Sequence, residues 1–159
     1  MSDTTSPRLP HAAADGPLSY AIFQLARTHR AHAAAMLRTM GLHPGQELLL
    51  MQLFDHDGLT QAELLERVGL DHSTVSKSLR RMQEAGLLTR EPAPHDRRVM
   101  VVRLTDTGRA LQKPIADMWR SLEQISVRDL TPDQVEEFTT CAQLIEQAVR
   151  DRSRQPPGE

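Results

Sequence analysis

The chain has 159 residues, of which 39% are hydrophobic and only 3% aromatic, and its formal net charge is −2. This length fits one domain with helical extensions and is too short for a catalytic domain joined to a second full domain. No apolar run approaches the roughly 20 residues of a membrane helix, and the polar N-terminus lacks a signal-peptide pattern. We therefore expect a cytoplasmic protein without a membrane partner. The single cysteine, Cys141, excludes an intrachain disulfide and a cysteine-rich zinc site.

The first half of the chain begins with two predicted helices. Pro17 suits the first turn of a helix, and apolar residues then recur at steps of three and four. This spacing predicts a long amphipathic helix over residues 17–41, ended by a glycine. Residues 44–55 are apolar on nearly all sides, which predicts a buried helix.

The next segment has the pattern of a helix-turn-helix. Residues 60–63, with the letters TQAE, form a capping box and predict a helix start at Thr60. Gly69 ends that short helix, Asp71 caps the following one, and Gly86 ends the second helix. Two helices joined by so tight a turn form a helix-turn-helix pattern.

Two strand-forming runs follow, at residues 87–91 and 99–104. Between them lies the charged, turn-rich segment 92–98, so the sequence predicts a β-hairpin with a basic tip. Pro92 cannot donate a ladder hydrogen bond and marks the end of the first strand.

The last part of the chain is predicted to be helical again. Thr105 caps a long helix whose apolar residues continue to about residue 125, and Pro114 within it should kink it or remove a hydrogen bond. Residues 131–134 form a second capping box with Pro at the first helical position. The six predicted helices and the hairpin make the chain mainly α.

The helix after the tight turn carries the candidate functional face. Its inward stripe is Val75, Leu79 and Met82, and its other side combines hydroxyls near the N-terminus with cations one to two turns later. Hydroxyls can contact phosphates or base edges, Lys and Arg reach phosphates, and Arg can read guanine. From this helix alone, an ordinary solvated surface explains the residues nearly as well as DNA binding does. The candidate DNA-binding residues are His72, Ser73, Thr74, Ser76, Lys77, Arg80 and Arg81.

The hairpin tip favours DNA binding over the solvated surface. His95, Arg97 and Arg98 lie in the same unit, and a helix in the major groove with a cationic loop beside it is a coherent docking geometry. We expect Asp96 to hold one of these arginines in a fixed pose. Residues 60–105 contain eight Lys and Arg against six Asp and Glu, so the positive charge is concentrated there.

At this point the chain resembles a known family. Asp96-Arg97-Arg98, followed after five residues by Leu104-Thr105 and then by Gly108, is similar to the wing signature of MarR-type winged-helix transcription regulators. The segments LTQAEL from Leu59, DHSTVS from Asp71 and LRRMQEAGLL from Leu79 resemble the helix-turn-helix of that family. The resemblance covers residues 17–150 with the elements in matching order. Val99 and Pro114 depart from the pattern, which suggests a changed hairpin bend and a kinked dimerisation helix.

The resemblance implies a winged helix-turn-helix domain joined to a helical dimerisation region. We expect disordered tails at 1–15 and 151–159 around a single domain at 16–150, with a winged helix at 44–105 and dimerisation helices at 17–41 and 106–150. The implied function is that of a homodimeric repressor of a pseudo-palindromic operator in double-stranded DNA, released by a small-molecule effector. Arg98 would be the wing arginine and Asp96 its orienting partner. No cofactor is expected.

Two other classes of function compare poorly with this one. An enzyme is not supported, because the chain has no nucleophile elbow, phosphate-binding loop or zinc-protease motif. The alternative is a helical protein-interaction module that retains the fold. It requires that the basic helix face and the hairpin tip do not bind DNA.

Several isolated residues bear on a possible effector. His29 and His32 are three apart on one helix but lack further metal ligands, so no metal site is expected. His29 is interpreted as a packed interface residue, with a proton sensor as the alternative. Cys141 lies beside an apolar stripe, where a buried lone cysteine is usually inert, and an oxidant sensor is the alternative. Tyr20 and Trp119 are expected to pack, and the alternative is that they line a pocket for an aromatic or phenolic effector.

Overall fold

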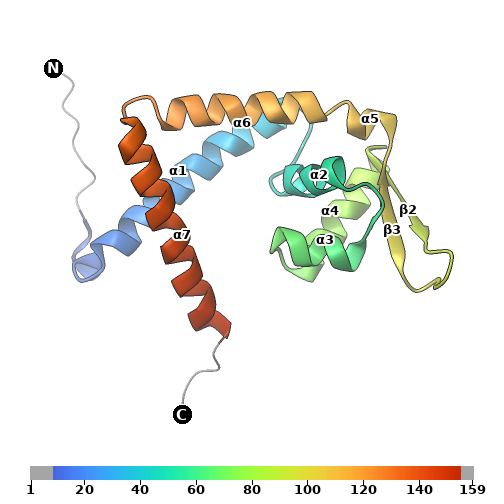
Figure 1. The fold of residues 1–159 in the computed structure, drawn as a ribbon, viewed down its shortest axis with the longest axis horizontal. Coiled ribbons are helices and arrows are strands. Elements are labelled where there is room, and N and C mark those ends of the chain that lie inside the picture. The colour runs from blue at the N-terminus through green and yellow to red at the C-terminus, as the bar shows by residue number, and fades with distance from the viewer. Residues whose placement is uncertain (1–8, 155–159) are drawn as a thin grey trace, which may run out of the picture. The chain divides into compact units, whose positions relative to one another are not determined.

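The computed structural model describes residues 9–154, whose ribbon is drawn in Figure 1. The chain divides into two compact units, Met1–Met118 and Trp119–Glu159, with the boundary inside the helix α6. The predicted fold class, mainly helical with a small β-hairpin, is confirmed. Within the described residues the elements are η1, a 3-10 helix (His11–Ala13), α1 (Pro17–Thr39), α2 (Gln46–Asp55), β1 (Leu59–Thr60), α3 (Gln61–Val68), α4 (His72–Glu84), β2 (Leu88–Pro92), β3 (Met100–Leu104), α5 (Asp106–Arg109), α6 (Gln112–Ser126) and α7 (Pro132–Arg154).

The first helix begins and ends where its sequence pattern predicts. Pro17 is its first residue, and past its C-terminus Gly41 takes a φ of +71°. The Leu42 N–H then donates to the Leu37 carbonyl over 3.0 Å. This is the hydrogen bond of a Schellman motif, in which a glycine in the left-handed conformation ends the helix. The second helix, α2, begins at Gln46, two residues later than predicted.

The helix-turn-helix is formed by α3 and α4, and its predicted caps are confirmed. The Thr60 hydroxyl accepts from the Glu63 N–H, and the Glu63 carboxylate accepts from the Thr60 N–H, so the capping box is complete. Gly69 follows α3 with a φ of +64°, and Asp71 caps α4. The turn between the helices therefore rests on contacts among residues close in sequence.

The predicted hairpin belongs to a sheet with one more strand than expected. Strands β2 and β3 pair in register from Leu88 opposite Leu104 to Pro92 opposite Met100. On the other side of β3 lies the two-residue strand β1, so the strand order is β1-β3-β2. Two residues are too short to show an alternating pattern, which is why the sequence did not reveal β1.

The prediction of one long helix after Thr105 is wrong, because two helices, α5 and α6, occupy this part of the chain. Thr105 does act as a cap, but α5 ends at Arg109 and α6 begins at Gln112. Pro114 is the third residue of α6, where its missing N–H needs no intrahelical partner. A continuous helix would press the Pro114 ring against the carbonyl four residues earlier, at Ala110. The helix therefore breaks before the proline and does not bend at it.

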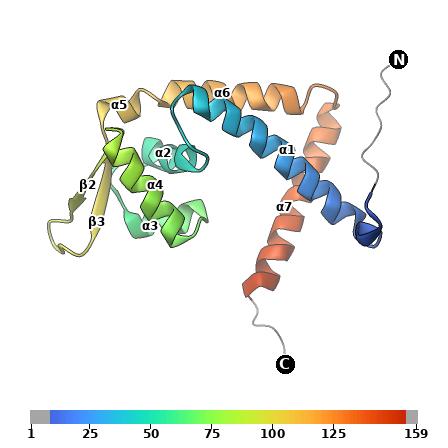
Figure 2. The same cartoon turned by 180° about the vertical axis from the view of Figure 1, so that it is seen from behind.

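The core of the first unit lies among α2, α3, α4 and the hairpin. Figure 1 shows these elements grouped together, and Figure 2 shows α4 from its outer side. The inward stripe predicted for α4 is buried, with Val75, Leu79 and Met82 each exposed by 1% or less. The remaining buried apolar residues of this cluster are Leu37, Leu42, Leu49, Leu50, Leu53, Leu59, Leu64, Leu88, Val102, Leu104, Ile115 and Met118.

The predicted tails fall partly outside the described residues. Residues 1–8 and 155–159 are not described, so the expectation of disorder there has no structural counterpart. The described residues before α1 include the 3-10 helix η1. The last helix continues through Arg154, past the predicted end near residue 150.

Candidate nucleic-acid interface

The outer face of α4 carries the side chains that the sequence singled out. His72, Ser73, Thr74, Lys77, Arg80 and Arg81 are exposed and Ser76 is half-buried. This distribution follows from the helical period, because the buried stripe occupies the opposite side of the cylinder. The Arg80 Nε lies 3.8 Å from a Glu84 carboxylate oxygen, in a pair whose two side chains are both well exposed. Such a pair contributes little to stability, so Arg80 is available to another anion.

The N-terminus of α4 is organised by a single carboxylate. The Asp71 carboxylate accepts the Thr74 N–H over 2.9 Å, the Ser73 hydroxyl over 2.6 Å and the Thr74 hydroxyl over 2.5 Å. The hydroxyl donors, followed by the backbone N–H, hold the pKa of Asp71 well below its usual range. Asp71 therefore stays ionised, and both hydroxyls direct their protons toward it.

A shallow groove of about 470 Å³ runs along α4 and is called the α4 groove below. It brings together five predicted residues and one that the sequence analysis missed, Arg90 of β2. The Arg90 Nε donates to the Gln83 side-chain oxygen over 2.6 Å, so a residue of α4 fixes its guanidinium. The groove is lined by His72, Ser73, Ser76, Lys77, Arg80 and Arg90.

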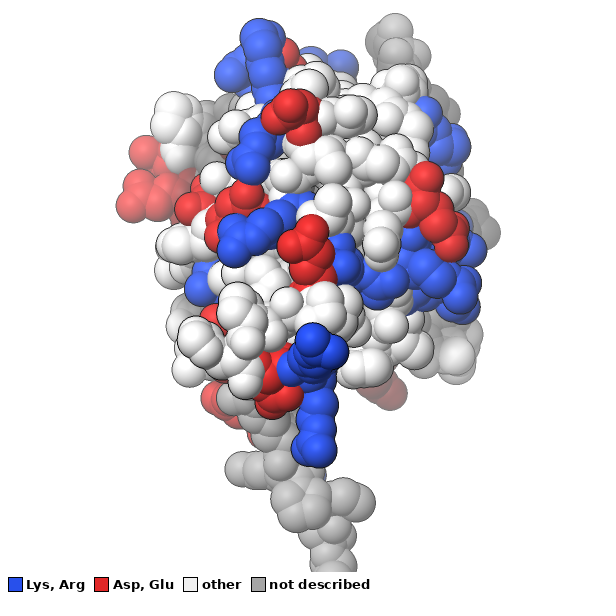
Figure 3. Space-filling model, turned by 90° about the vertical axis from the view of Figure 1, so that its right-hand side faces the viewer, with Lys and Arg blue, Asp and Glu red and all other residues white. Residues whose placement is uncertain are grey.

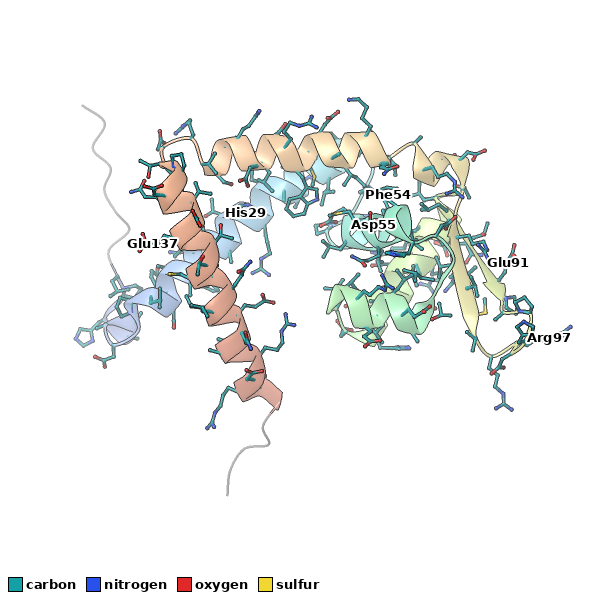
Figure 4. The ribbon with its side chains drawn as sticks, in the orientation of Figure 1. His29, Phe54, Asp55, Glu91, Arg97 and Glu137 are labelled. Carbon is teal, nitrogen blue, oxygen red and sulfur yellow. The ribbon has the colours of Figure 1, made fainter. Side chains whose placement is uncertain are left out.

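Strand alternation explains why Arg90 faces this groove. Leu88 is buried, and Arg90, two residues later, lies on the same face of β2, opposite the buried Val102 of β3. Glu91 falls on the other face and is exposed, and Figure 4 shows it on the hairpin. The period of two in the predicted strand was the signal that could have identified Arg90.

The hairpin tip presents its cations at two different places. Arg97 is exposed, and Figure 4 shows it at the tip of the hairpin. Arg98 instead lines a second groove of about 340 Å³, together with His72 and the start of α3. This groove, called the α3 groove, is lined by Thr60, Gln61, Ala62, Leu65, His72, Arg98, Val99 and Met100. Thr74, Arg81, His95 and Arg97 line neither groove.

Asp96 orients the tip through the backbone. Its carboxylate accepts the Arg98 N–H over 2.9 Å, and the Val99 N–H donates to its carbonyl over 3.0 Å. The contact differs from the expected one, in which the carboxylate would hold a guanidinium. The turn is fixed while the arginine side chains keep their charge for another partner.

The base of the hairpin is held by residues distant in sequence. The Asp57 carboxylate accepts the Leu104 N–H over 2.9 Å and the Arg109 guanidinium over 2.8 Å, which joins the loop before β1 to the end of β3 and to α5. Partial burial works to raise the pKa of Asp57, but the Leu104 and Arg109 hydrogen bonds outweigh it and lower that pKa. Asp57 was not predicted, because nothing local in sequence marks its partners.

The residues of the wing signature have clear structural reasons. The Thr105 hydroxyl donates to the Gly86 carbonyl over 2.6 Å and accepts the Gly108 N–H over 3.1 Å. A Cβ on Gly108 would lie 2.0 Å from the Leu87 carbonyl oxygen, closer than any side chain can come. Thus Thr105 and Gly108 allow α5 to approach the start of β2.

Positive charge is unevenly distributed on the hairpin side of the molecule. Figure 3 views this side, and Lys and Arg gather at mid-height on its right, with acidic side chains at the upper border of that cluster. The described residues contain no group of three His, Cys, Asp or Glu side chains arranged to hold a metal ion. No helix within residues 9–154 has the length and apolarity required to cross a membrane.

The residues considered for effector sensing lie on the long helices. His29 is half-buried on α1, where Figure 4 labels it, and His32 is exposed. Tyr20 is also half-buried, and its hydroxyl accepts from the Gln24 amide over 2.8 Å. Trp119 is 37% exposed. Cys141 is exposed on α7, in contrast to the buried position that an inert cysteine would have.

Comparison with known proteins identifies one family. A family model described as the MarR family matches residues 32–99. The HTH-type transcriptional repressor Rv2887 of Mycobacterium tuberculosis is 29% identical over 124 residues, which are 78% of this chain and 89% of that protein. A crystal structure of MarR is 30% identical, with a TM-score of 0.71 over 84% of this chain and 98% of the other. The PcaV transcriptional regulator from Streptomyces coelicolor, in complex with its natural ligand, is 25% identical, with a TM-score of 0.76 over 85% of this chain and 95% of the other.

Proposed function

The chain belongs to the MarR family of transcriptional regulators, whose named relatives are regulators and not enzymes, and on that basis we propose that it is a sequence-specific, homodimeric repressor. It binds a pseudo-palindromic operator and leaves it when a small-molecule effector binds. In this proposal residues 44–105 form the DNA-binding part, and residues 17–41 and 106–150 form the dimerisation helices.

The observation that carries the proposal is the α4 groove. Lys77 and Arg80 from the helix and Arg90 from the neighbouring strand line one open groove, without an acidic residue among its lining side chains. A row of cations beside an exposed helix face suits the phosphates that flank a major groove. Arg97 lies at the end of the hairpin, and in this proposal it reaches an adjacent minor groove, where arginine is a favoured residue.

Exposed apolar side chains support the homodimer. On α1, Leu18 and Phe23 are about 60% exposed, and on α7, Phe138 is 55% and Leu144 64% exposed. Large apolar groups that are exposed on a helix mark an interaction surface. A second copy of the chain is the partner that also doubles the number of base contacts and fixes the spacing of the half-sites.

The effector part of the proposal is supported by the likeness to PcaV, which was solved with its natural ligand. We propose an aromatic or phenolic effector for this chain. The direct test is a panel of simple benzoates and phenols added to the protein–DNA complex. Release of DNA by some members and not by others supports the proposal, and an unchanged complex with every member contradicts it for that class.

DNA binding is tested by fluorescence polarisation, with labelled duplex from the upstream region of the gene and a scrambled duplex of equal length. We expect saturable binding that favours the upstream DNA and falls with salt, with a log–log slope of about −0.9 for each phosphate contacted. Equal affinity for both duplexes would contradict sequence-specific binding at that site.

The matched variants are Arg98→Ala and Arg128→Ala. Arg98 lines the α3 groove, whereas Arg128 lies between α6 and α7, where its guanidinium pairs with Asp129. We expect Arg98→Ala to weaken DNA binding broadly and Arg128→Ala to leave it unchanged. If neither variant alters binding, or if the protein binds no DNA at low salt, the interaction-module alternative is favoured.

A further inference from the structure

The hydroxyls at the start of α4 differ from ordinary surface hydroxyls, because a carboxylate already takes their protons. An ionised carboxylate can only accept hydrogen bonds, so in the contacts of Asp71 with Ser73 and Thr74 the hydroxyls must be the donors. Hydrogen bonds to a charged acceptor are roughly twice as strong as neutral ones. Each hydroxyl has a single proton, and its outward side therefore offers only lone pairs.

This polarity excludes several partners that a serine or threonine would otherwise serve. Phosphate oxygens accept hydrogen bonds, and so do O6 and N7 of guanine and O4 of thymine. None of them gains a hydrogen bond from a hydroxyl whose proton is directed at Asp71. In the major groove the donors are the exocyclic amino groups of adenine and cytosine. Ser73 lines the α4 groove together with the cations there.

Resting on the proposed DNA-binding function, we propose that Asp71 is a specificity-positioning residue: it fixes Ser73 and Thr74 as acceptors, so that the start of α4 selects adenine or cytosine and rejects guanine or thymine on one strand of each half-site. Lys77 and Arg80 then serve the phosphates. This narrows the expectation that the hydroxyls contact phosphates or base edges to base edges alone, and it assigns base reading and backbone binding to different turns of α4.

Each base pair carries one amino group in the major groove, so the predicted preference has a distinctive form. It does not separate A·T from G·C pairs but separates the amino bases from the keto bases on a given strand. A net hydrogen bond of this kind corresponds to a discrimination of about two- to tenfold. A position that accepts A and C equally and disfavours both G and T is the expected signature.

The experiment selects bound duplexes from a random-centre library with the wild-type protein and with Asp71→Asn. Asparagine also caps helices, so its side-chain oxygen keeps the Thr74 N–H and the Ser73 hydroxyl, which share one oxygen of Asp71, while its amide donates to the Thr74 hydroxyl. That hydroxyl then turns its proton outward. We expect the A/C preference at one position of each half-site to be lost or reversed toward G/T. Thermal unfolding followed by circular dichroism checks that the variant is folded.

A second pair of changes keeps the test decisive if Asp71→Asn folds poorly. Ser73→Ala and Thr74→Val remove the hydroxyls, and their combination should abolish the A/C preference, after which Asp71→Asn should change the base preference no further. With wild-type protein, replacing the selected adenine by nebularine, which lacks the 6-amino group, should weaken binding by about two- to tenfold.

Three results have distinct meanings. An A/C position that is sensitive to Asp71→Asn, to loss of the hydroxyls and to nebularine supports the proposal. Specific binding without any A/C position, or with an A/C preference that survives both sets of variants, overturns it and leaves the DNA-binding function intact. Binding without any sequence preference contradicts the proposed function itself.

Discussion

The segment from α2 to α5 and the helix α7 place their apolar residues in opposite environments. In the former, Leu49, Leu53 and Leu64 are fully buried, whereas no described side chain of α7 is buried and its Phe138 is 55% exposed. Both regions have regular caps, so the contrast does not come from local helix quality. It indicates that the first region is stabilised by the core that it forms with Leu37, Ile115 and Met118, and that the second needs a partner to cover it.

The largest effect is expected from placing a charged side chain on the exposed apolar face of α7. We expect Phe138→Arg to convert the proposed dimer to monomer, because each of two symmetric copies loses a buried ring. The lost burial alone corresponds to about 3–6 kcal/mol per dimer. Size-exclusion chromatography with light scattering measures the mass.

The control for this change is Gln143→Arg, at an exposed position of α7 on a different side from Phe138 and Leu144, which should remain dimeric. Circular dichroism should show that the α2–α5 segment of Phe138→Arg stays folded. A wild-type protein that is monomeric at micromolar concentration would contradict the homodimer, and a dimeric Phe138→Arg would move the interface away from this face.

The next largest effect is expected inside the α2–α5 segment. In Gly108→Ala the new methyl group meets the Leu87 carbonyl oxygen at 2.0 Å, and the backbone of α5 or β2 must move. We expect a loss of about 3 kcal/mol in the free energy of unfolding, the upper part of the usual range for overpacking. Urea denaturation measures it. Gly16→Ala, which meets no atom within 4 Å, should change stability by less than about 1 kcal/mol. Equal effects of the two substitutions would show that α5 does not depend on this close approach.

A smaller loss is expected where the hairpin is joined to the helices. Asp57→Ala leaves the Leu104 N–H and the Arg109 guanidinium without their acceptor, and we expect about 2 kcal/mol of destabilisation at pH 7. Arg109→Ala keeps the backbone bond and should cost about half as much. Because the pKa of Asp57 is lowered in the folded state, its ionic contribution is present above about pH 4 and is lost as the pH falls through the folded pKa. The difference between Asp57→Ala and wild type should therefore narrow in acid, and a constant difference would argue against an ionic contribution.

The features that could be predicted from the sequence are those defined by local contacts, whereas long-range contacts could not be predicted. The Thr60–Glu63 box, the Asp71 cap and the glycines after α1 and α4 are defined within a few residues, and each was predicted. The strand β1 and the contacts of Asp57 were missed. Asp57 bonds to Leu104, 47 residues away, and neither residue carries a pattern that refers to the other.

For the candidate site, the sequence predicted which residues lie on the outer face of α4 but not what they contact. The helical period places Ser73 and Thr74 outward, yet only the structure shows that Asp71 takes their protons. Arg90 was missed because the hairpin was assessed by its tip and not by the alternation along β2. The break before Pro114 was missed because a continuous apolar stripe favoured one helix.

The next prediction concerns DNA affinity and not stability, and it tests the role of Arg90 in the α4 groove. We expect Arg90→Ala to weaken binding by about tenfold and to reduce the log–log salt slope by about 0.9, the value for one phosphate contact. Gln83→Ala should have a smaller effect in the same direction, since it only frees the Arg90 side chain. Fluorescence polarisation at several salt concentrations gives both quantities. An unchanged salt slope in Arg90→Ala would mean that Arg90 holds Gln83 and α4 but contacts no phosphate.

The smallest expected effect concerns Glu47, an acid that is buried at the start of α2. Burial raises the pKa of Glu47, although the Gly45 N–H, at 2.7 Å from its carboxylate, acts in the opposite direction. Since the pKa of Glu47 is higher in the folded than in the unfolded state, its contribution to stability is fully present below the unfolded-state pKa of about 4.3. This contribution is lost as the pH rises through the folded-state pKa. Glu47→Gln keeps an acceptor for Gly45 and cannot ionise, so its stability relative to wild type should increase over this pH range and then level off. Glu66→Gln, at an exposed position of α3, is the control. A wild-type minus Glu47→Gln difference that does not change between pH 4 and pH 8 would show that ionisation of Glu47 carries no cost in the fold.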